Sequence, residues 1–173
     1  MILLDPAKCS GCRRCEVSCS FFHTRTVGRS ASRIKVVKIE EQGLDYPVVC
    51  QACEERYCTE CPTGAVRIGD LGQVHVDPDL CTGCGTCETL CPVGAIELHE
   101  ERPLVCDLCD GDPHCVKACT MGALFFDPGA RDSVSLGAFH EGCEGLSPEE
   151  KRIRFTLKAF EELRQRWIWA RRA

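Results

Sequence analysis

Sixteen of the seventeen cysteines in this 173-residue chain fall into four groups of four, which we call quartets. The first and third quartets share the spacing C-x2-C-x2-C-x3-C, and the second and fourth have a wider gap before their third cysteine. Three quartets end alike, in CPTGA, CPVGA and CTMGA, so the chain is predicted to be a duplicated pair of motifs. The quartets are Cys9, Cys12, Cys15 and Cys19; Cys50, Cys53, Cys58 and Cys61; Cys81, Cys84, Cys87 and Cys91; Cys106, Cys109, Cys115 and Cys119.

The C-x2-C-x2-C spacing is typical of loops that wrap around a cubane [4Fe-4S] cluster and offer it three thiolates. Gly11, Gly83 and Gly85 in these loops permit the close backbone approach that such a wrap needs. The fourth cysteine is expected to start a short helix that carries its sulfur away, and in two-cluster ferredoxins it ligates the other cluster. The quartets are therefore best read in pairs.

Zinc and disulfides are the two alternatives for so many cysteines. C-x2-C pairs also occur in zinc ribbons, but four successive quartets do not follow ribbon spacing. The first residues, MILLDPAKC, lack the basic and apolar regions of a signal peptide, which predicts a chain kept in the reducing cytoplasm, where disulfides are rare. No apolar window is long enough to predict a transmembrane segment.

The elements that must position the cysteines are short. Alternating runs predict small antiparallel hairpins beside the cluster loops, and a further hairpin from Arg33–Ile39 and Leu44–Val49. Aromatic residues make up only 6% of the chain, so the apolar core is thin and the fold is expected to depend on its clusters. The predicted fold class is α+β. The alternating runs are Ala65–Ile68, Gln73–Val76, Ala95–Leu98 and Ala123–Phe126.

The quartet pattern resembles the four-cluster ferredoxin-like subunits that accompany molybdenum or tungsten enzymes such as dimethyl sulfoxide reductase, nitrate reductase, formate dehydrogenase and aldehyde oxidoreductases. The match covers residues 1–127, and it is most similar to the small subunit of a tungsten aldehyde oxidoreductase. The resemblance implies two ferredoxin-like units and four clusters, with quartet one paired to quartet four and quartet two to quartet three. The implied ligand sets are Cys9, Cys12, Cys15 and Cys119; Cys106, Cys109, Cys115 and Cys19; Cys50, Cys53, Cys58 and Cys91; Cys81, Cys84, Cys87 and Cys61.

The function expected from this resemblance is a relay of single electrons between a catalytic subunit and a second redox partner, a flavin subunit or a ferredoxin. A free polyferredoxin carrier is an alternative, as is a subunit of a hydrogenase, a formate dehydrogenase or a carbon monoxide dehydrogenase. No catalytic residues are predicted, because no Ser, His and Asp set, phosphate loop or dinucleotide fingerprint is present. Nucleic acid is an unfavourable partner for the acidic body.

The C-terminal segment differs in charge from the rest. Residues 147–173 carry a net charge of +4, whereas residues 1–146, including a predicted linker over 128–146, carry −9. Ser147, Pro148 and Glu150 form a capping box that predicts the start of a helix, closed by Arg171 and Arg172. An apolar stripe follows at helical spacing, and it could pack on the body, dock on a partner, join two copies or lie on a membrane. The stripe is Ile153, Leu157, Phe160, Leu163 or Arg164, and Trp167.

Several reactive side chains lie outside this scheme. Cys143 is predicted to be a free structural cysteine, and the five histidines are predicted to lie on the surface. Arg13 and Arg14 lie inside the first cluster loop, where they could either raise a cluster's potential or remain solvated.

Overall fold

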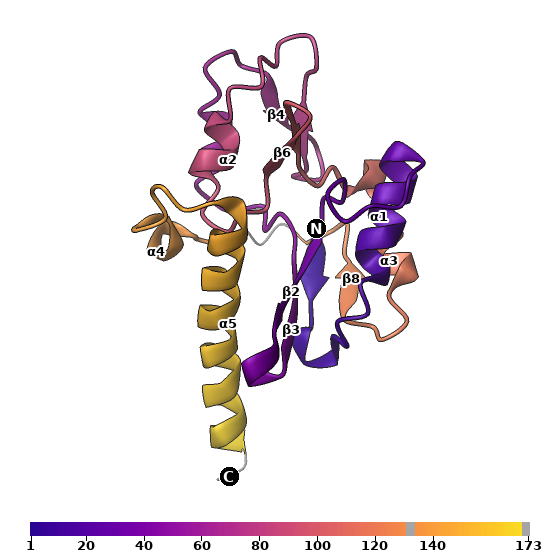
Figure 1. Cartoon of the computed structure of the whole chain (residues 1–173), viewed down its shortest axis with the longest axis vertical. Helices are drawn as coiled ribbons and strands as arrows, with labels where there is room; N and C mark the ends of the chain where they lie inside the picture. The colour runs from indigo at the N-terminus through magenta and orange to yellow at the C-terminus, as the bar shows by residue number, and fades with distance from the viewer. Residues whose placement is uncertain (131–133, 171–173) are drawn as a thin grey trace.

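The computed structural model describes residues 1–130 and 134–170, with side chains described up to residue 161. Within this part, the strands form four separate two-stranded antiparallel sheets linked by cysteine-bearing loops and short helices (Figure 1). A mixed α and β fold with short hairpins, as predicted, is confirmed. Three sheets are hairpins of consecutive strands: β2 (Lys35–Ile39) with β3 (Leu44–Val48), β4 (Val66–Ile68) with β5 (Val74–Val76), and β6 (Glu97–His99) with β7 (Arg102–Leu104).

The fourth sheet joins the two ends of the cysteine-rich body. Strand β8 (Leu124–Phe126) pairs with β1 (Ile2–Leu4) in the register Ile2 to Phe126 and Leu4 to Leu124. The run Ala123–Phe126 was expected in a local hairpin, and that expectation is wrong, because its partner is the chain's first strand. Strand β1 is the continuous apolar run Ile-Leu-Leu, which shows no alternation with polar residues, so the sequence does not predict it.

Three helices each begin one residue before the third cysteine of a quartet and contain that cysteine. Helix α1 (Arg14–Thr24) contains the third and fourth cysteines of its quartet, whereas α2 (Thr86–Leu90) and α3 (His114–Ala118) end immediately before Cys91 and Cys119. The expectation that the fourth cysteine starts a helix is therefore wrong. Because the last two cysteines are four residues apart, a single helical turn separates their sulfurs along the helix axis and directs them to different sites.

Buried side chains form two cores, which we name by their position in the sequence. The first core lies beside α1 and α3 and holds Cys15, Cys19, Cys106 and Cys115 among its ten buried residues. The second core lies beside α2 and holds Cys58, Cys87 and Cys91 among its thirteen. Thiols occupy positions that large aliphatic side chains fill in most domains, as the low aromatic content predicts.

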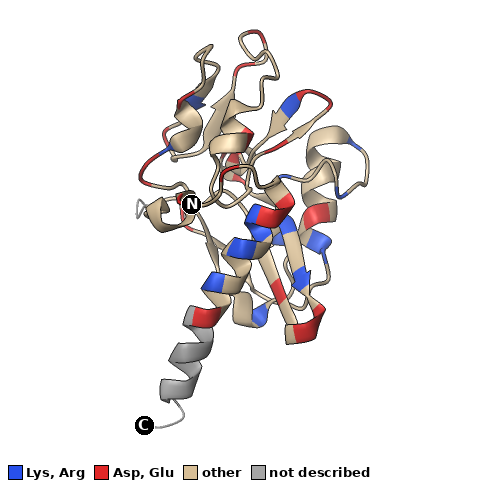
Figure 2. Ribbon diagram, turned by 60° about the vertical axis from the view of Figure 1, so that its left-hand side comes forward, with Lys and Arg blue, Asp and Glu red and all other residues tan. Residues whose placement is uncertain are grey.

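Helix α5 (Pro148–Ala170) begins at the predicted capping box and runs along the β2–β3 hairpin (Figures 1 and 2). The Glu150 carboxylate accepts from the Ser147 backbone N–H at 2.8 Å, and the Glu150 N–H donates to Ser147 Oγ at 3.3 Å. The Leu163, Arg164, Trp167, Arg171 and Arg172 side chains of the predicted stripe and closing turn lie outside the described residues. None of the helices in the described part has the length and apolar character needed to cross a bilayer.

The face that α5 turns toward the body is the basic one. Lys151 and Arg152 are buried beside Phe155, whereas Ile153 and Leu157 of the apolar stripe are each 38% exposed. The helix therefore does pack on its own body, but with the face opposite to the stripe.

The segment predicted as a linker, 128–146, contains α4 (Gly137–His140), and within its described part Leu136 and Phe139 pack on the second core. Leu136 is buried, and the Glu55 carboxylate accepts from the backbone N–H groups of Leu136 and Gly137 and from the Ser135 hydroxyl. These hydrogen bonds, the one from Ser135 foremost, lower the pKa of Glu55 to about 2.

Candidate metal centres

The cysteines of the four quartets converge in four sets, each made of three cysteines from one quartet and one from another. Set 1 lines one small cavity, and set 4 lines another. Set 1 is Cys9, Cys12, Cys15 and Cys119, and set 4 is Cys61, Cys81, Cys84 and Cys87.

The other two sets are defined by the thiols that act on one another electrostatically. Burial, followed by the charges of Cys50, Cys91 and Cys53, raises the pKa of Cys58 to about 12. Burial, followed by Cys19 and Cys109, likewise raises the pKa of Cys115. Cys19, Cys106 and Cys115 also share the first core. We therefore group Cys19, Cys106, Cys109 and Cys115 as set 2, and Cys50, Cys53, Cys58 and Cys91 as set 3.

Thiols of one set also raise the pKa of thiols in the next set, and these pairs show which sets are neighbours in space. Cys15 of set 1 contributes to the raised pKa of Cys115 in set 2, and Cys50 of set 3 contributes to that of Cys106 in set 2. Cys87 of set 4 contributes to the pKa of Cys58 in set 3. The sets thus follow one another from 1 to 4.

Backbone N–H groups in the loops point at the sulfurs. The Ala95 and Ala123 N–H groups donate to Cys91 Sγ and Cys119 Sγ, each at 3.3 Å, and the Arg33 N–H donates to Cys19 Sγ at 3.3 Å. Both alanines end the repeated motif after a fourth cysteine. Such donors stabilise a thiolate, which is the form that binds metal.

The spread of the thiols fits a cluster better than a single ion. A tetrahedral zinc site with Zn–S bonds of about 2.3 Å holds its sulfurs only about 3.8 Å apart. Among the described residues, the one group drawn together for a single ion is His23, Asp107 and Cys109, whose ligand atoms lie within 4.8 Å of one another. None of the four cysteine sets, all of which lie in the described part, is that compact, and their all-thiol composition is the ligand set of a [4Fe-4S] cluster.

Comparisons with known proteins agree with this geometry. Residues 74–97 match the family described as a 4Fe-4S binding domain. The chain is 40% identical to the polyferredoxin-like subunit of aliphatic sulfonate oxidoreductase from Pyrococcus furiosus, over 68% of this chain and 70% of the relative. It is 35% identical to the Escherichia coli electron transport protein HydN, over 71% and 85% of the two proteins. It is 34% identical to one of the subunits of the anaerobic dimethyl sulfoxide reductase of Escherichia coli, over 72% and 71%.

This protein is a member of the polyferredoxin-like iron-sulfur electron-transfer subunits of oxidoreductases. Like these relatives, this polyferredoxin-like subunit transfers electrons and is not itself a catalytic subunit.

His23 is a residue of this polyferredoxin-like subunit that the sequence analysis placed wrongly on the surface. Its side chain is only 11% exposed, and its Nε2 lies 3.7 Å from Cys109 Sγ and 3.6 Å from a carboxylate oxygen of Asp107. Burial, followed by the nearby Arg33 charge, lowers the pKa of His23, so the imidazole is favoured in its neutral form. The signal in the sequence is the four-residue step from Cys19 to His23 along one helix.

Two carboxylates were also missed, although the sequence repeats them. Glu16 and Glu88 each follow the third cysteine of a quartet, and each accepts a 2.7 Å hydrogen bond from a backbone N–H of a neighbouring segment, that of Val36 or Leu98. Glu16 is fully buried and also pairs with Arg13. The positive charge of Arg13 is thus balanced by the Glu16 carboxylate.

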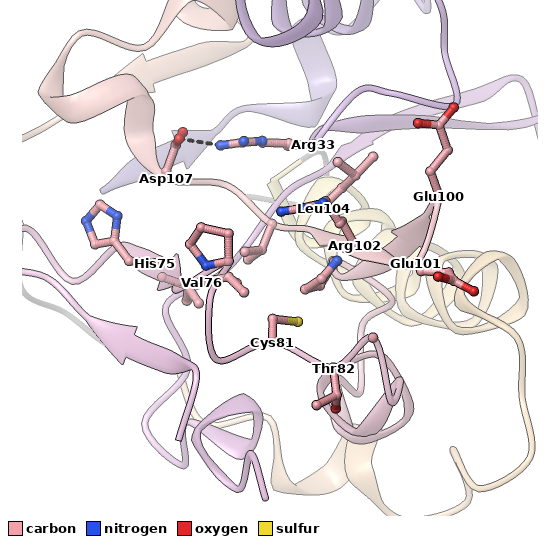
Figure 3. Close-up of a pocket in the computed structure, with 15 residues that line it drawn as sticks. Arg33, His75, Val76, Cys81, Thr82, Glu100, Glu101, Arg102, Leu104 and Asp107 are labelled. Atoms are coloured by element: carbon pink, nitrogen blue, oxygen red, sulfur yellow. Dashed lines mark hydrogen bonds and ion pairs between the residues drawn. The ribbon is translucent and has the colours of Figure 1, made fainter. Parts of the chain in front are cut away.

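A polar cleft of about 440 Å³ lies beside set 4 (Figure 3). Its walls carry the ion pair between Arg33 and Asp107 as well as Arg102 and Glu101, and Cys81 lies on its floor. The cleft gives solvent access to one side of a set 4 thiol.

Proposed function

We propose that the subunit holds one [4Fe-4S] cluster in each set and passes single electrons along the row from set 1 to set 4 or in reverse. The observation that carries this proposal is the order of the sets, linked by the neighbouring thiols of Cys15 and Cys115, Cys106 and Cys50, and Cys58 and Cys87. Each bound cluster would supply a one-electron redox centre.

The two ends of the row are its points of contact with other redox centres in this proposal. Cys12 in set 1 and Cys84 in set 4 are exposed, whereas the cysteines of sets 2 and 3 are all buried or half-buried. Hydrogen bonds from the Arg14 N–H lower the pKa of Cys12, and those from the Thr86 hydroxyl lower the pKa of Cys84. In each end set, the exposed thiol is thus also one whose thiolate form is favoured.

We further propose a catalytic subunit with a tungsten or molybdenum cofactor at one end of the row and a flavin subunit or ferredoxin at the other. The named relatives, which include subunits of an oxidoreductase and of a reductase, support a place in such a complex. The catalytic subunit of a hydrogenase, a formate dehydrogenase or a carbon monoxide dehydrogenase fits the same geometry. Sixteen thiols that must stay reduced favour the cytoplasm as the compartment.

The body over 1–127 would carry the relay, and the helix over 147–173 would contribute to docking. Ile153 and Leu157 on the outer face of α5 are exposed to water, and exposed apolar side chains that lie together are typical of an interaction surface. They therefore favour a subunit that docks on a partner over a carrier that diffuses freely. The same face could join two copies, which sedimentation over a range of concentrations would reveal.

The test is the iron and acid-labile sulfide content of anaerobically purified protein, with zinc measured alongside. About sixteen of each per chain are expected, and Cys91→Ser should lower the iron content by about one to four per chain, since set 3 then lacks its fourth thiolate. Cys143→Ser is the matched control, because Cys143 is also buried but lies outside the four sets. Stoichiometric zinc without sulfide would refute the proposal.

A further inference from the structure

Lys151 on α5 is a lysine buried against the second core. It is 1% exposed, and its ammonium donates to the carbonyl oxygens of Thr89 at 2.6 Å and Glu88 at 3.2 Å. Both carbonyls belong to the last turn of α2, and Cys91 of set 3 comes directly after that helix. The positive charge is thus fixed beside the segment that delivers a set 3 thiol.

This charge lacks a carboxylate partner among the described residues. Its neighbour Arg152, by contrast, contacts Glu97 at 3.1 Å as well as the Gly94 carbonyl at 2.9 Å. A buried ammonium without a counter-charge is strongly unfavourable, and carbonyl dipoles offset only part of that cost. A negative group is therefore expected nearby, and thiolate-ligated cluster binding in set 3 would provide it.

The contact is confined to one of the repeated loops. Gly64, Gly94 and Gly122 occupy the same position in the CPTGA, CPVGA and CTMGA motifs and have similar positive φ angles of 66°, 63° and 63°. A Cβ on Gly94 would lie 2.1 Å from the Pro148 carbonyl oxygen, whereas a Cβ on Gly64 or Gly122 would meet nothing within 4 Å. Helix α5 thus covers the loop that follows Cys91 and neither of the other two.

We propose that Lys151 is the counter-cation of set 3 and raises the reduction potential of the cluster that this set holds. The inference rests on the proposed function, because it requires a cluster at set 3. Reduction adds one negative charge, which a fixed cation in a region of low dielectric constant stabilises. With Lys151 in place, an electron in the row would preferentially reduce the cluster of set 3.

The experiment is a potentiometric titration of the four-cluster protein followed by electron paramagnetic resonance. Lys151→Met should make reduction of the set 3 cluster about tenfold less favourable, which equals about 59 mV for one electron. Lys151→Arg keeps the positive charge, so the potential of its set 3 cluster should stay close to the wild-type value. Each cluster contributes one reduction step to the titration. The step that is altered or lost in Cys91→Ser belongs to the set 3 cluster.

Lys158→Met is the matched control, because it removes the same charge from the same helix at an exposed position over the Phe139 ring. It should leave the set 3 step in place. Lys151→Gln keeps N–H donors but no charge, so it should reproduce the shift even if Lys151→Met fails to fold.

Three results would overturn the inference: an unmoved set 3 step in Lys151→Gln, an equal shift in Lys158→Met, or equal shifts of all four steps. Each of these leaves the iron content at about sixteen, so it refutes the role of Lys151 alone. A wild-type protein with too little iron and sulfide for four clusters would instead refute the proposed function.

Discussion

The two cores carry related cysteine motifs but neutralise their buried charges in different ways. In the first core, Glu16 pairs with Arg13 and Arg29, and Asp107 pairs with Arg33, so cations and carboxylates come from the quartet loops and the residues beside them. In the second core, the buried cations Lys151 and Arg152 come from α5, far along the sequence. The two copies therefore share their thiols and the carboxylates of Glu16 and Glu88, whereas the cations around each copy come from unrelated segments.

The largest effect is expected from removing iron, which tests what the cores share. Since thiols are core residues in both, each core should lose its packing when the clusters are extracted under reducing conditions. Near-ultraviolet circular dichroism should collapse, and a protease should cleave the body rapidly. A cooperative thermal transition that survives extraction would show that the apolar side chains suffice.

The next largest effect distinguishes the loops of the two cores. Gly94→Ala and Gly122→Ala share the cost of a side chain at positive φ, but only the former clashes with α5. Gly94→Ala should therefore be about 2 kcal/mol more destabilising, which lowers Tm by about 4–8 °C more for a protein of this size. Differential scanning fluorimetry under anaerobic conditions measures this difference, and equal Tm values would show that α5 is not docked on the loop.

A smaller effect separates the two repeated carboxylates. Glu16→Gln removes the partner of two arginines in the first core, whereas Glu88→Gln weakens one backbone hydrogen bond. Glu16→Gln should lower the free energy of unfolding by about 1 kcal/mol more than Glu88→Gln does, because it weakens two ion pairs as well. The difference stays this small because Arg29 is largely exposed and its ion pair is screened by solvent. Thermal unfolding of the two variants gives the comparison, and a larger loss in Glu88→Gln would contradict it.

The smallest effect concerns the contact of His23 with Cys109, a thiol of set 2. If the neutral imidazole donates to Cys109 Sγ, His23→Phe should make reduction at set 2 about threefold less favourable, roughly 30 mV. His75→Phe is the control, since His75 is exposed on β5. Four unchanged potentials in His23→Phe would show that the contact carries no hydrogen bond to sulfur.

The sequence predicted those parts of the molecule that depend on local spacing. The β2–β3 hairpin and the Ser147 cap follow from short-range patterns, and the structure has both. The positions at which the short helices begin and end were mispredicted. The spacing of Cys87 and Cys91 fits a helix that begins at the fourth cysteine and one that ends there equally well.

Sixteen thiols, their repeated spacing and the protein's family can be read directly from the order of the residues. The buried face of α5, the pairing of β1 with β8 and the position of His23 depend on contacts between distant segments, so they follow from the folded chain alone. The usual rule that an apolar stripe turns inward presumes an apolar core. Here the last turn of α2 and the loop after Cys91 leave carbonyl oxygens at Thr89 and Gly94 that need donors, and Lys151 and Arg152 satisfy them.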